Sequence, residues 1–341
     1  MTGGKRNLKI LIKSVNWIGD AMLLTPSLRA LKQAFPESRV SLIVKPGVAQ
    51  VFSANPHVDE LIIEGQGEYA GLAGYLRMIR RLRKSSYDAG IVVQPKSFKA
   101  ALTVFLSGAE RRIGYSHNAR NIFLTEKIKP HAGILHDADV FFGVFSPLGA
   151  VLTDREPVFN AGEESRFYAA EFLRAKGITE SDKVAGINPG AKNGARRWPA
   201  ENYARLADKL SAEYGYKIIV FGGPDDAATV RKVVALSRHA PVVVYPGLFQ
   251  LFRLAGACRI FVSNDTGPAH VAAAAGVPVV VLYGATDPRR TAPLGRVGSI
   301  AVKAGVPCSP CFLEKCDAAE PMDCMRKIEV EEVLEAARSL L

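Results

Sequence analysis

Near-continuous runs of valine, isoleucine and other apolar residues constrain the fold more than any other feature of this sequence. Between residues 216 and 284 they are YKIIVFGG, PVVVYPG, RIFVSND and VPVVVLYG, and each ends at glycine or polar residues. KVAGINPGA, earlier in the chain, is also predicted to be a strand followed by a loop. Strands this apolar are typical of a parallel sheet that helices cover on both faces. The segment PAENYARLADKLSAEYG is predicted to be a helix, because Pro199 lies near its start and Gly215 at its end. This half of the chain is therefore predicted to be a doubly wound α/β domain.

The first half of the chain has the same alternation of strands and helices. LKILIKS, RVSLIVKP, VDELIIE and AGIVVQP are predicted strands, and RRIGYS is predicted to be a short strand or a turn. The pattern loosens into Pro- and Gly-bearing chain near residues 131–157. We expect an α/β fold of two doubly wound domains that face each other across a cleft. Their expected bounds are 1–160 and 161–327, followed by a C-terminal helix over 328–341 that could pack back on the first domain.

Composition excludes a disordered or membrane-spanning chain. The 341 residues are 48% hydrophobic and 23% charged, and no apolar run approaches the roughly 20 residues that span a bilayer. The N-terminus leads into a strand-like run without a signal peptide, so we expect a cytoplasmic protein.

The net charge of +11 favours an anionic partner: nucleic acid, a phosphate-bearing ligand or an anionic membrane. Much of the excess lies in YLRMIRRLRKSSYD. Leu72, just before this segment, and Leu76, Ile79 and Leu82 within it recur at helical spacing, and basic residues occupy the other faces. A solvated surface helix explains this segment as well as a binding surface does.

The stretch SNDTGPAH joins a buried strand to an alanine-rich helix. In open α/β sheets ligands bind where strands end and helices begin. Gly267 lets a ligand approach the backbone, Pro268 suits the first helical turn, and Asp265 or Thr266 could cap the helix. His270 lies in the same turn, and a helix N-terminus favours phosphate. An ordinary capped helix explains Asp265 but not the whole group, so a ligand site is favoured.

Other turns carry related chemistry. In NWIGDAM, Asp20 begins a helix and is either an N-cap or a general base for an attacking hydroxyl. NPGAKNGARRWP combines small residues with cations, which suits a pyrophosphate. FGGPDD offers Asp225 and Asp226 to ribose hydroxyls, or is a surface loop. The sequence has no G-x-G-x-x-G after the first strand and no G-x-x-x-x-G-K-[ST], which disfavours hydride transfer and P-loop phosphoryl transfer.

Taken together, these segments resemble the lipopolysaccharide heptosyltransferases of glycosyltransferase family 9, and the heptosyltransferase II group most of all. The matching pieces are NWIGDAMLLTPSLRAL, QPKSFKAAL, NPGAKNGARRWPAENYARLADKL, VFGG and VSNDTGPAHVAAAAGVPVVVLYGATDP. The resemblance implies the GT-B fold and inverting, metal-independent transfer from ADP-heptose to a core heptose of lipopolysaccharide. It also implies a peripheral location at the inner face of the inner membrane, with that anionic surface as a partner and no role for nucleic acid.

The resemblance also implies roles for individual residues. Asp20 matches the catalytic base, and the acceptor is expected at Asn16, Gly19, Lys96, Ser97 and Lys99. The expected donor-binding residues are Gly190, Lys192, Arg196, Arg197, Trp198, Gly222, Gly223, Asp265, Thr266, Gly267, Pro268 and His270.

Two segments depart from the family pattern. PGLFQLFRLAGAC is about one helical turn shorter than the corresponding family helix and lacks a hydroxyl residue after Gly247, which affects the expected adenine and ribose contacts. The second segment is a C-x2-C-x4-C-x7-C array after the last predicted strand. No cofactor is expected for catalysis, but the array could hold a structural zinc ion or remain reduced and unliganded; its residues are Cys308, Cys311, Cys316 and Cys324.

Three alternatives remain at this stage. One is heptosyltransferase I, or another family member with a different acceptor. Another is a nucleotide-sugar epimerase or hydrolase of similar architecture, and the third is a nucleic-acid binder, which would leave the glycine turns unexplained.

Overall fold

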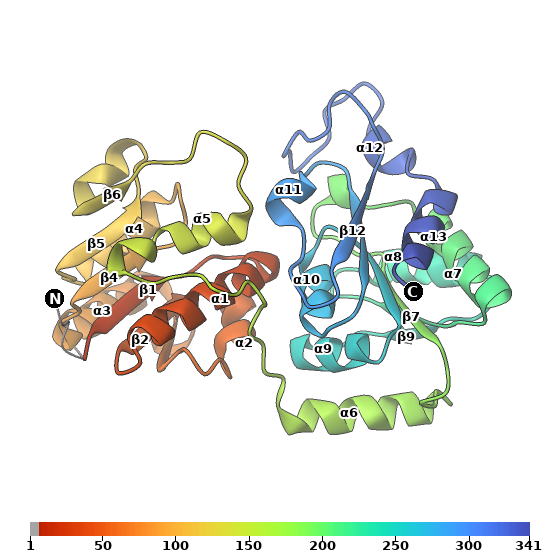
Figure 1. Cartoon of the computed structure of the whole chain (residues 1–341), viewed down its shortest axis with the longest axis horizontal. Coiled ribbons are helices and arrows are strands. Elements are labelled where there is room, and N and C mark those ends of the chain that lie inside the picture. The colour runs from red at the N-terminus through yellow and green to blue at the C-terminus, as the bar shows by residue number, and fades with distance from the viewer. Residues whose placement is uncertain (1–6) are drawn as a thin grey trace. The chain divides into compact units, whose positions relative to one another are not determined.

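The computed structural model describes residues 7–341 and divides the chain into two compact units, with the division between Asn160 and Ala161. Each unit contains one six-stranded sheet flanked by helices (Figure 1). Every strand pair in both sheets is parallel. The predicted α/β class with two doubly wound sheets is therefore confirmed.

The two sheets have the same topology. The first has the strand order β3-β2-β1-β4-β5-β6, and the second has β12-β11-β10-β7-β8-β9. Counted from the first strand of each unit, both orders are 3-2-1-4-5-6, the doubly wound nucleotide-binding arrangement. The order reverses between β1 and β4 in the first unit and between β7 and β10 in the second.

The strands of the first unit lie close to the predicted ones, apart from β6, which was not predicted. They are β1 (Lys9–Lys13), β2 (Arg39–Val44), β3 (Glu60–Ile63), β4 (Ala89–Val92), β5 (Arg111–Tyr115) and β6 (Glu126–Ile128). The α-helices of this unit are α1 (Ile18–Ala34), α2 (Ala49–Phe52), α3 (Gly71–Ser85), α4 (Phe98–Leu106) and α5 (Asp137–Gly143).

In the second unit, β12 was not predicted from the sequence. The strands are β7 (Val184–Asn188), β8 (Lys217–Phe221), β9 (Val242–Val244), β10 (Ile260–Asn264), β11 (Val279–Tyr283) and β12 (Ser299–Lys303). The helices are α6 (Gly162–Ala175), η5 (Gly194–Arg196), α7 (Ala200–Tyr214), α8 (Ala227–Leu236), α9 (Leu248–Gly256), α10 (Gly267–Ala274), α11 (Pro288–Thr291), α12 (Asp323–Arg326) and α13 (Val330–Ser339).

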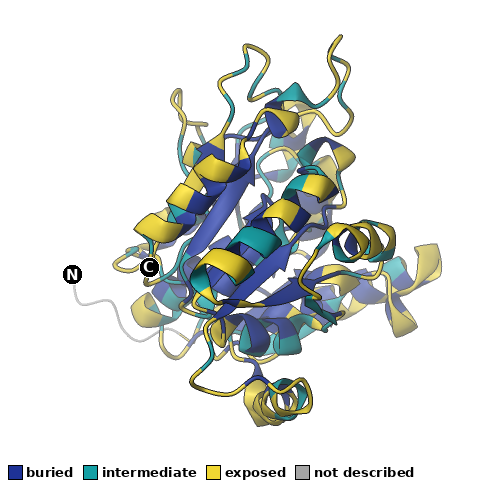
Figure 2. Ribbon diagram, turned by 90° about the vertical axis from the view of Figure 1, so that its right-hand side faces the viewer, coloured by how far each residue is buried: buried dark blue, intermediate teal, exposed yellow. Residues whose placement is uncertain are grey.

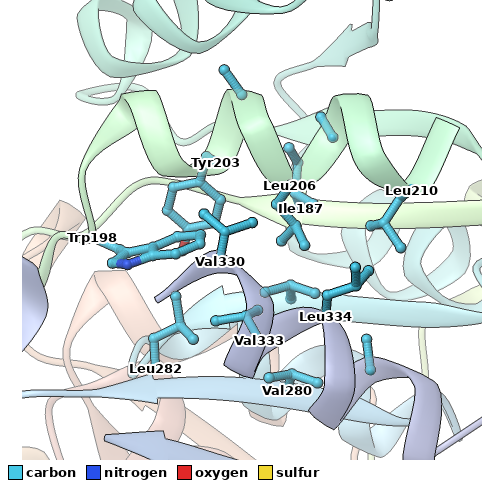
Figure 3. Packing of buried hydrophobic residues seen from close by; sticks show 14 of the residues in the cluster. Ile187, Trp198, Tyr203, Leu206, Leu210, Val280, Leu282, Val330, Val333 and Leu334 are labelled. Atoms are coloured by element: carbon cyan, nitrogen blue, oxygen red, sulfur yellow. The ribbon is translucent and has the colours of Figure 1, made fainter. Parts of the chain in front are cut away.

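The C-terminal helix α13 belongs to the core of the second unit. Val330, Val333 and Leu334 pack with Tyr203 of α7 and with residues of β7 and β11 (Figure 3). Outside the core, Glu331 pairs with Lys209 of α7 at 3.3 Å. The expectation that this helix could pack back on the first domain is wrong, because its apolar face packs against α7, β7 and β11 of the second unit.

In each unit the sheet is buried between the helices that flank it. The central strands are almost wholly buried, and the helices expose one face (Figure 2). Helix α3 buries Met78, Ile79 and Leu82, but leaves Leu72 and Leu76 exposed. The apolar stripe of this basic helix is therefore shifted from the predicted one. No helix within residues 7–341 is long and apolar enough to cross a membrane.

Candidate functional site

The polar turns predicted from the sequence follow the strands on either side of each reversal in strand order. In the first unit, β1 leads to the turn before α1, and β4 leads to the segment Gln94–Ser97. In the second unit, β7 leads to the loop 189–197, and β10 leads to the start of α10. Such reversals leave a crevice at the carboxyl ends of the strands, where ligands of open α/β sheets bind.

Two buried asparagines tie together the two loops of the second unit. The Asn188 side chain donates to the hydroxyls of Ser263 and Thr266, at 3.0 and 3.2 Å. Asn264 donates to the carbonyl of Pro189 at 3.0 Å and accepts the Trp198 backbone N–H at 3.0 Å. The β7 and β10 loops are thus held as one rigid surface. Asn264 belongs to the polar group predicted at this turn, whereas Asn188 was not predicted, and the contacts of both could not be predicted because their partners are distant in the sequence.

The Asp265 carboxylate is turned inward. It accepts a hydrogen bond from the Thr286 hydroxyl at 2.6 Å and pairs with Arg196 at 3.2 Å. The side chain of Asp265 is only 4% exposed. In this structure Asp265 joins the β7, β10 and β11 loops, and a direct donor contact by Asp265 stays a prediction.

Arg197 and Gly190 both lie next to the carboxylate of Asp226. The Arg197 guanidinium donates to the Ala191 carbonyl at 2.8 Å and lies 4.0 Å from the Asp226 carboxylate. That carboxylate accepts the Gly223 backbone N–H at 2.9 Å. A Cβ atom on Gly190 would lie 2.1 Å from the same carboxylate, so any larger residue there would displace the Asp226 side chain. Asp226 therefore orders the glycine turns.

The start of α10 is built as predicted, except for its cap. Gly267 and Pro268 are its first two residues. Thr266 occupies the N-cap position without a side-chain cap hydrogen bond, so the predicted capping by Asp265 or Thr266 is wrong. The reason is that the Thr266 hydroxyl accepts from Asn188 while Asp265 faces Arg196 and Thr286. His270 is buried in this helix.

Trp198 lies in the core of the second unit. Its indole N–H donates to the Ile328 carbonyl at 3.0 Å, and its ring packs edge-on against Tyr203 (Figure 3). The residue is 1% exposed. Trp198 is therefore an anchor for the loop that carries Arg196 and Arg197, and a direct contact of Trp198 with the donor stays a prediction.

The other predicted donor residues of this unit differ in exposure. Lys192 is exposed on the β7 loop. A Cβ atom on Gly222 would lie 2.7 Å from the ring of Tyr245, which is itself half exposed at the end of β9. Tyr245 was not predicted, and its ring packs directly against Gly222.

In the first unit, Asp20 lies in the first turn of α1. The helix begins at Ile18, so Gly19 is its second residue and lies inside the helix. Asn16 precedes it and, like Gly19 and Asp20, is partly exposed. An acidic residue in a first helical turn is favoured by the helix dipole, which leaves the structural and the catalytic interpretation of Asp20 both open.

Three charged side chains meet at the carboxyl ends of the strands of this first sheet. Glu64, just after β3, pairs with Lys13 of β1 and with Lys99 of α4, each at 2.6 Å. Burial acts to raise the pKa of Glu64, but the two lysines outweigh it, and the pKa lies below its ordinary value. Burial lowers the pKa of Lys13 below its ordinary value, and the nearby Glu64 carboxylate offsets only part of this decrease. Lys13 and Glu64 were not predicted as site residues.

The remaining predicted acceptor residues lie around α4. The Ser97 hydroxyl caps this helix by accepting the Ala100 N–H at 3.1 Å, and Lys96 is exposed beside it. Gln94 donates to the Ser14 carbonyl at 2.6 Å, and the buried Arg120 donates to the Gln94 carbonyl at 2.7 Å. The first bond joins the ends of β1 and β4, and the second ties the segment around Arg120 to the end of β4.

The structure gives no support to the predicted zinc site. Within residues 7–341 no group of three or more His, Cys, Asp or Glu side chains is arranged to hold a metal ion. Cys308 is exposed, whereas Cys324 is buried. The Cys324 sulfur packs against Gly284, where an added Cβ atom would lie 2.9 Å from it. The Cys316 sulfur accepts the Met322 N–H, and Cys311 is partly exposed.

Comparisons with known proteins agree with this geometry. Residues 75–321 match the model of glycosyltransferase family 9 (heptosyltransferase). Lipopolysaccharide heptosyltransferase 2 of Escherichia coli K12 is 29% identical over 314 residues, which cover 84% of this chain and 86% of that protein.

Two solved structures extend the match to the whole fold. A family 9 glycosyl transferase from Veillonella parvula is 28% identical with a TM-score of 0.86, covering 98% of this chain and 97% of the other. ADP-heptose lps heptosyltransferase II of E. coli is 24% identical with a TM-score of 0.77, covering 98% of each chain. The shared fold is the predicted GT-B architecture.

Proposed function

The chain belongs to glycosyltransferase family 9, the heptosyltransferases, and we propose that it transfers heptose from ADP-heptose to a heptose of the lipopolysaccharide inner core. The relatives named lipopolysaccharide heptosyltransferase 2 support this acceptor over other members of the family.

The observation that carries the donor site is the joined surface of the β7 and β10 loops. Asn188 and Asn264 fix the start of α10 beside Arg196 and Arg197. A helix N-terminus and guanidinium groups both stabilise a diphosphate. In the proposal, ADP-heptose binds here, and these groups neutralise the charge that develops on the leaving ADP, so no metal ion is needed.

The acceptor side of the proposal rests on the first unit. Asp20 takes the proton from the acceptor hydroxyl, whose oxygen attacks the anomeric carbon on the face opposite to ADP. The carbon–oxygen bond to ADP breaks, and the configuration inverts. Lys96 and Lys99 would hold the acceptor near Asp20, because both lie at the end of β4 or the start of α4.

Transfer of labelled heptose from ADP-heptose tests this function. The acceptors are lipid A–core molecules that carry no heptose or one heptose. Transfer only to the one-heptose acceptor supports the proposal. Transfer to the heptose-free acceptor would identify the activity of a first heptosyltransferase instead. Donor binding without transfer to either acceptor would favour another acceptor or a nucleotide-sugar epimerase.

We further propose that α3 rests on the anionic inner face of the inner membrane. Arg80, Arg83 and Lys84 are exposed on this helix, and Leu72 and Leu76 are exposed near its start. Each cation near such a surface contributes about 1 kcal/mol to binding. This location would bring the protein to a lipid-borne acceptor while it remains on the cytoplasmic side.

A further inference from the structure

The three charged side chains Lys13, Glu64 and Lys99 at the carboxyl ends of the first sheet's strands differ in burial. The side chains of Lys13 and Glu64 are 4% and 7% exposed, whereas that of Lys99 is 67% exposed. Each carboxylate oxygen of Glu64 takes one ammonium group, Oε2 from Lys13 and Oε1 from Lys99. Glu64 is therefore anchored from below by one lysine and holds the other at the surface.

A second contact restricts the Lys99 side chain. Its ammonium lies 5.3 Å from the centre of the Tyr75 ring. The Tyr75 hydroxyl is itself hydrogen-bonded to Thr103 of α4 at 2.9 Å. A long exposed lysine side chain ordinarily samples many rotamers, and holding it costs conformational entropy. Here Glu64 and Tyr75 together restrict where the ammonium of Lys99 can lie.

Stability alone is a weak reason for this arrangement. A buried ion pair is often no more stable than a packed apolar pair of the same size, because both ions lose hydration. Lys99 also lies in the first turn of α4, where the helix dipole disfavours a cation. The group has two ammoniums and one carboxylate, and exposed Lys96 adds a further charge three residues before Lys99. An excess of positive charge faces solvent at the edge where Asp20 lies.

We propose that Glu64 is a positioning residue: anchored by Lys13, it holds the Lys99 ammonium where it binds an oxyanion of the acceptor. The inference rests on the proposed function for the identity of the acceptor. The oxyanion is a phosphate or a carboxylate, since an ammonium group binds either. Glu64 itself does not touch the acceptor in this arrangement, because its side chain is only 7% exposed and its oxygens face the ammonium groups of Lys13 and Lys99.

Steady-state kinetics of Glu64→Gln, Lys99→Met and the double variant test the proposal. Loss of a charge-assisted contact predicts that each single variant raises the acceptor KM about tenfold, with kcat and the KM for ADP-heptose unchanged. The double variant should equal the single ones, because Glu64 acts through Lys99. Multiplied effects in the double variant, or a change in kcat alone, would overturn the proposal.

Two further variants separate positioning from damage to the fold. Glu64→Gln leaves the Lys13 charge buried without its partner, which could destabilise the unit. In Lys13→Met/Glu64→Gln the buried pair is neutral, and the acceptor KM should still rise about tenfold. Lys127→Met removes an exposed lysine from the edge strand β6 and should leave the acceptor KM unchanged.

A binding measurement gives a result even if the chain transfers no heptose. Inorganic phosphate and acetate are each tested for protection of the Lys99 amine against acetylation, measured by mass spectrometry. Protection in the wild type that is lost in Lys13→Met/Glu64→Gln supports the proposal, and the more effective anion identifies the oxyanion. Equal protection in both proteins, or none in the wild type, would overturn it. Absence of transfer in the wild type would reject the proposed function separately.

Discussion

The Thr286 hydroxyl donates a 2.6 Å hydrogen bond to the buried carboxylate of Asp265. This bond joins the loop after β11 to the loop after β10. Because the same carboxylate pairs with Arg196, the two residues together fix a cation of the proposed diphosphate site.

Thr286→Val should therefore weaken both stability and donor binding. Losing a hydrogen bond to a buried charged group costs about 1.5–3 kcal/mol in the free energy of unfolding. ADP affinity should fall as well, because Arg196 is less well held. Denaturant unfolding and ADP titration measure the two effects. Thr291→Val is the control, since the Thr291 hydroxyl is 3.5 Å from Asp265 and its loss should matter less. Equal effects of both variants would contradict this account.

Gly190→Ala should reduce ADP affinity strongly. The added Cβ would lie 2.1 Å from the Asp226 carboxylate, so Asp226 must move and release the Gly223 N–H. We expect at least a tenfold rise in the ADP dissociation constant, which corresponds to about 1.4 kcal/mol. Gly194→Ala lies in the same loop with no atom within 4 Å of its Cβ position and should bind ADP normally. Normal binding by Gly190→Ala would show that this turn does not shape the donor site.

Asp182 should stabilise the second unit fully only above about pH 4. The Thr179 backbone N–H, the Lys217 ammonium and the Thr179 hydroxyl lower the pKa of Asp182 from 3.8 to about 2. A lowered pKa in the folded state means that the stabilisation is complete above the unfolded pKa and is lost as pH falls from about 4 to about 2. The unfolding free energies of wild type and Asp182→Asn should therefore differ at pH 5 and converge near pH 2. A difference that stays constant over this range would contradict the assignment.

Neutralising the exposed cations of α3 should weaken membrane binding. The triple change Arg80→Gln, Arg83→Gln and Lys84→Gln removes about 3 kcal/mol of attraction, or roughly a hundredfold in affinity for anionic vesicles. Sedimentation with vesicles that contain phosphatidylglycerol measures the loss. The matched control neutralises Arg166, Arg174 and Lys176, three exposed cations of the second unit. An equal loss in the control would mean that net charge, and not α3, drives binding.

The apolar patterns predicted most of both sheets, because buried parallel strands are continuous runs of branched residues. β6 and β12 escaped prediction because charged and small residues interrupt their apolar patterns, EKI and SIAVK. The position of α13 could not be read from the sequence, since its amphipathic pattern shows which face is apolar but not which surface receives it. The same holds for α3, whose exposed Leu72 and Leu76 fit a helical stripe as well as its buried residues do.

The glycine turns of the candidate site were predictable because their local sequence requires close backbone approach. The contacts that organise those turns were not. Glu64 meets Lys13 across 51 positions of sequence, and Asp265 meets Thr286 across 21. Trp198 was assigned to the donor by resemblance, and only the fold shows that its indole N–H is used in the core.

The central claim is that Asp20 removes the proton from the acceptor hydroxyl. Asp20→Asn keeps the shape of the side chain and removes its basicity. We predict that heptose transfer falls at least a hundredfold, while ADP-heptose binding stays within twofold of wild type. Glu110→Gln, an exposed carboxylate in the loop before β5, is the control and should transfer heptose normally. Transfer by Asp20→Asn at the wild-type rate would contradict the assignment of Asp20 as the base.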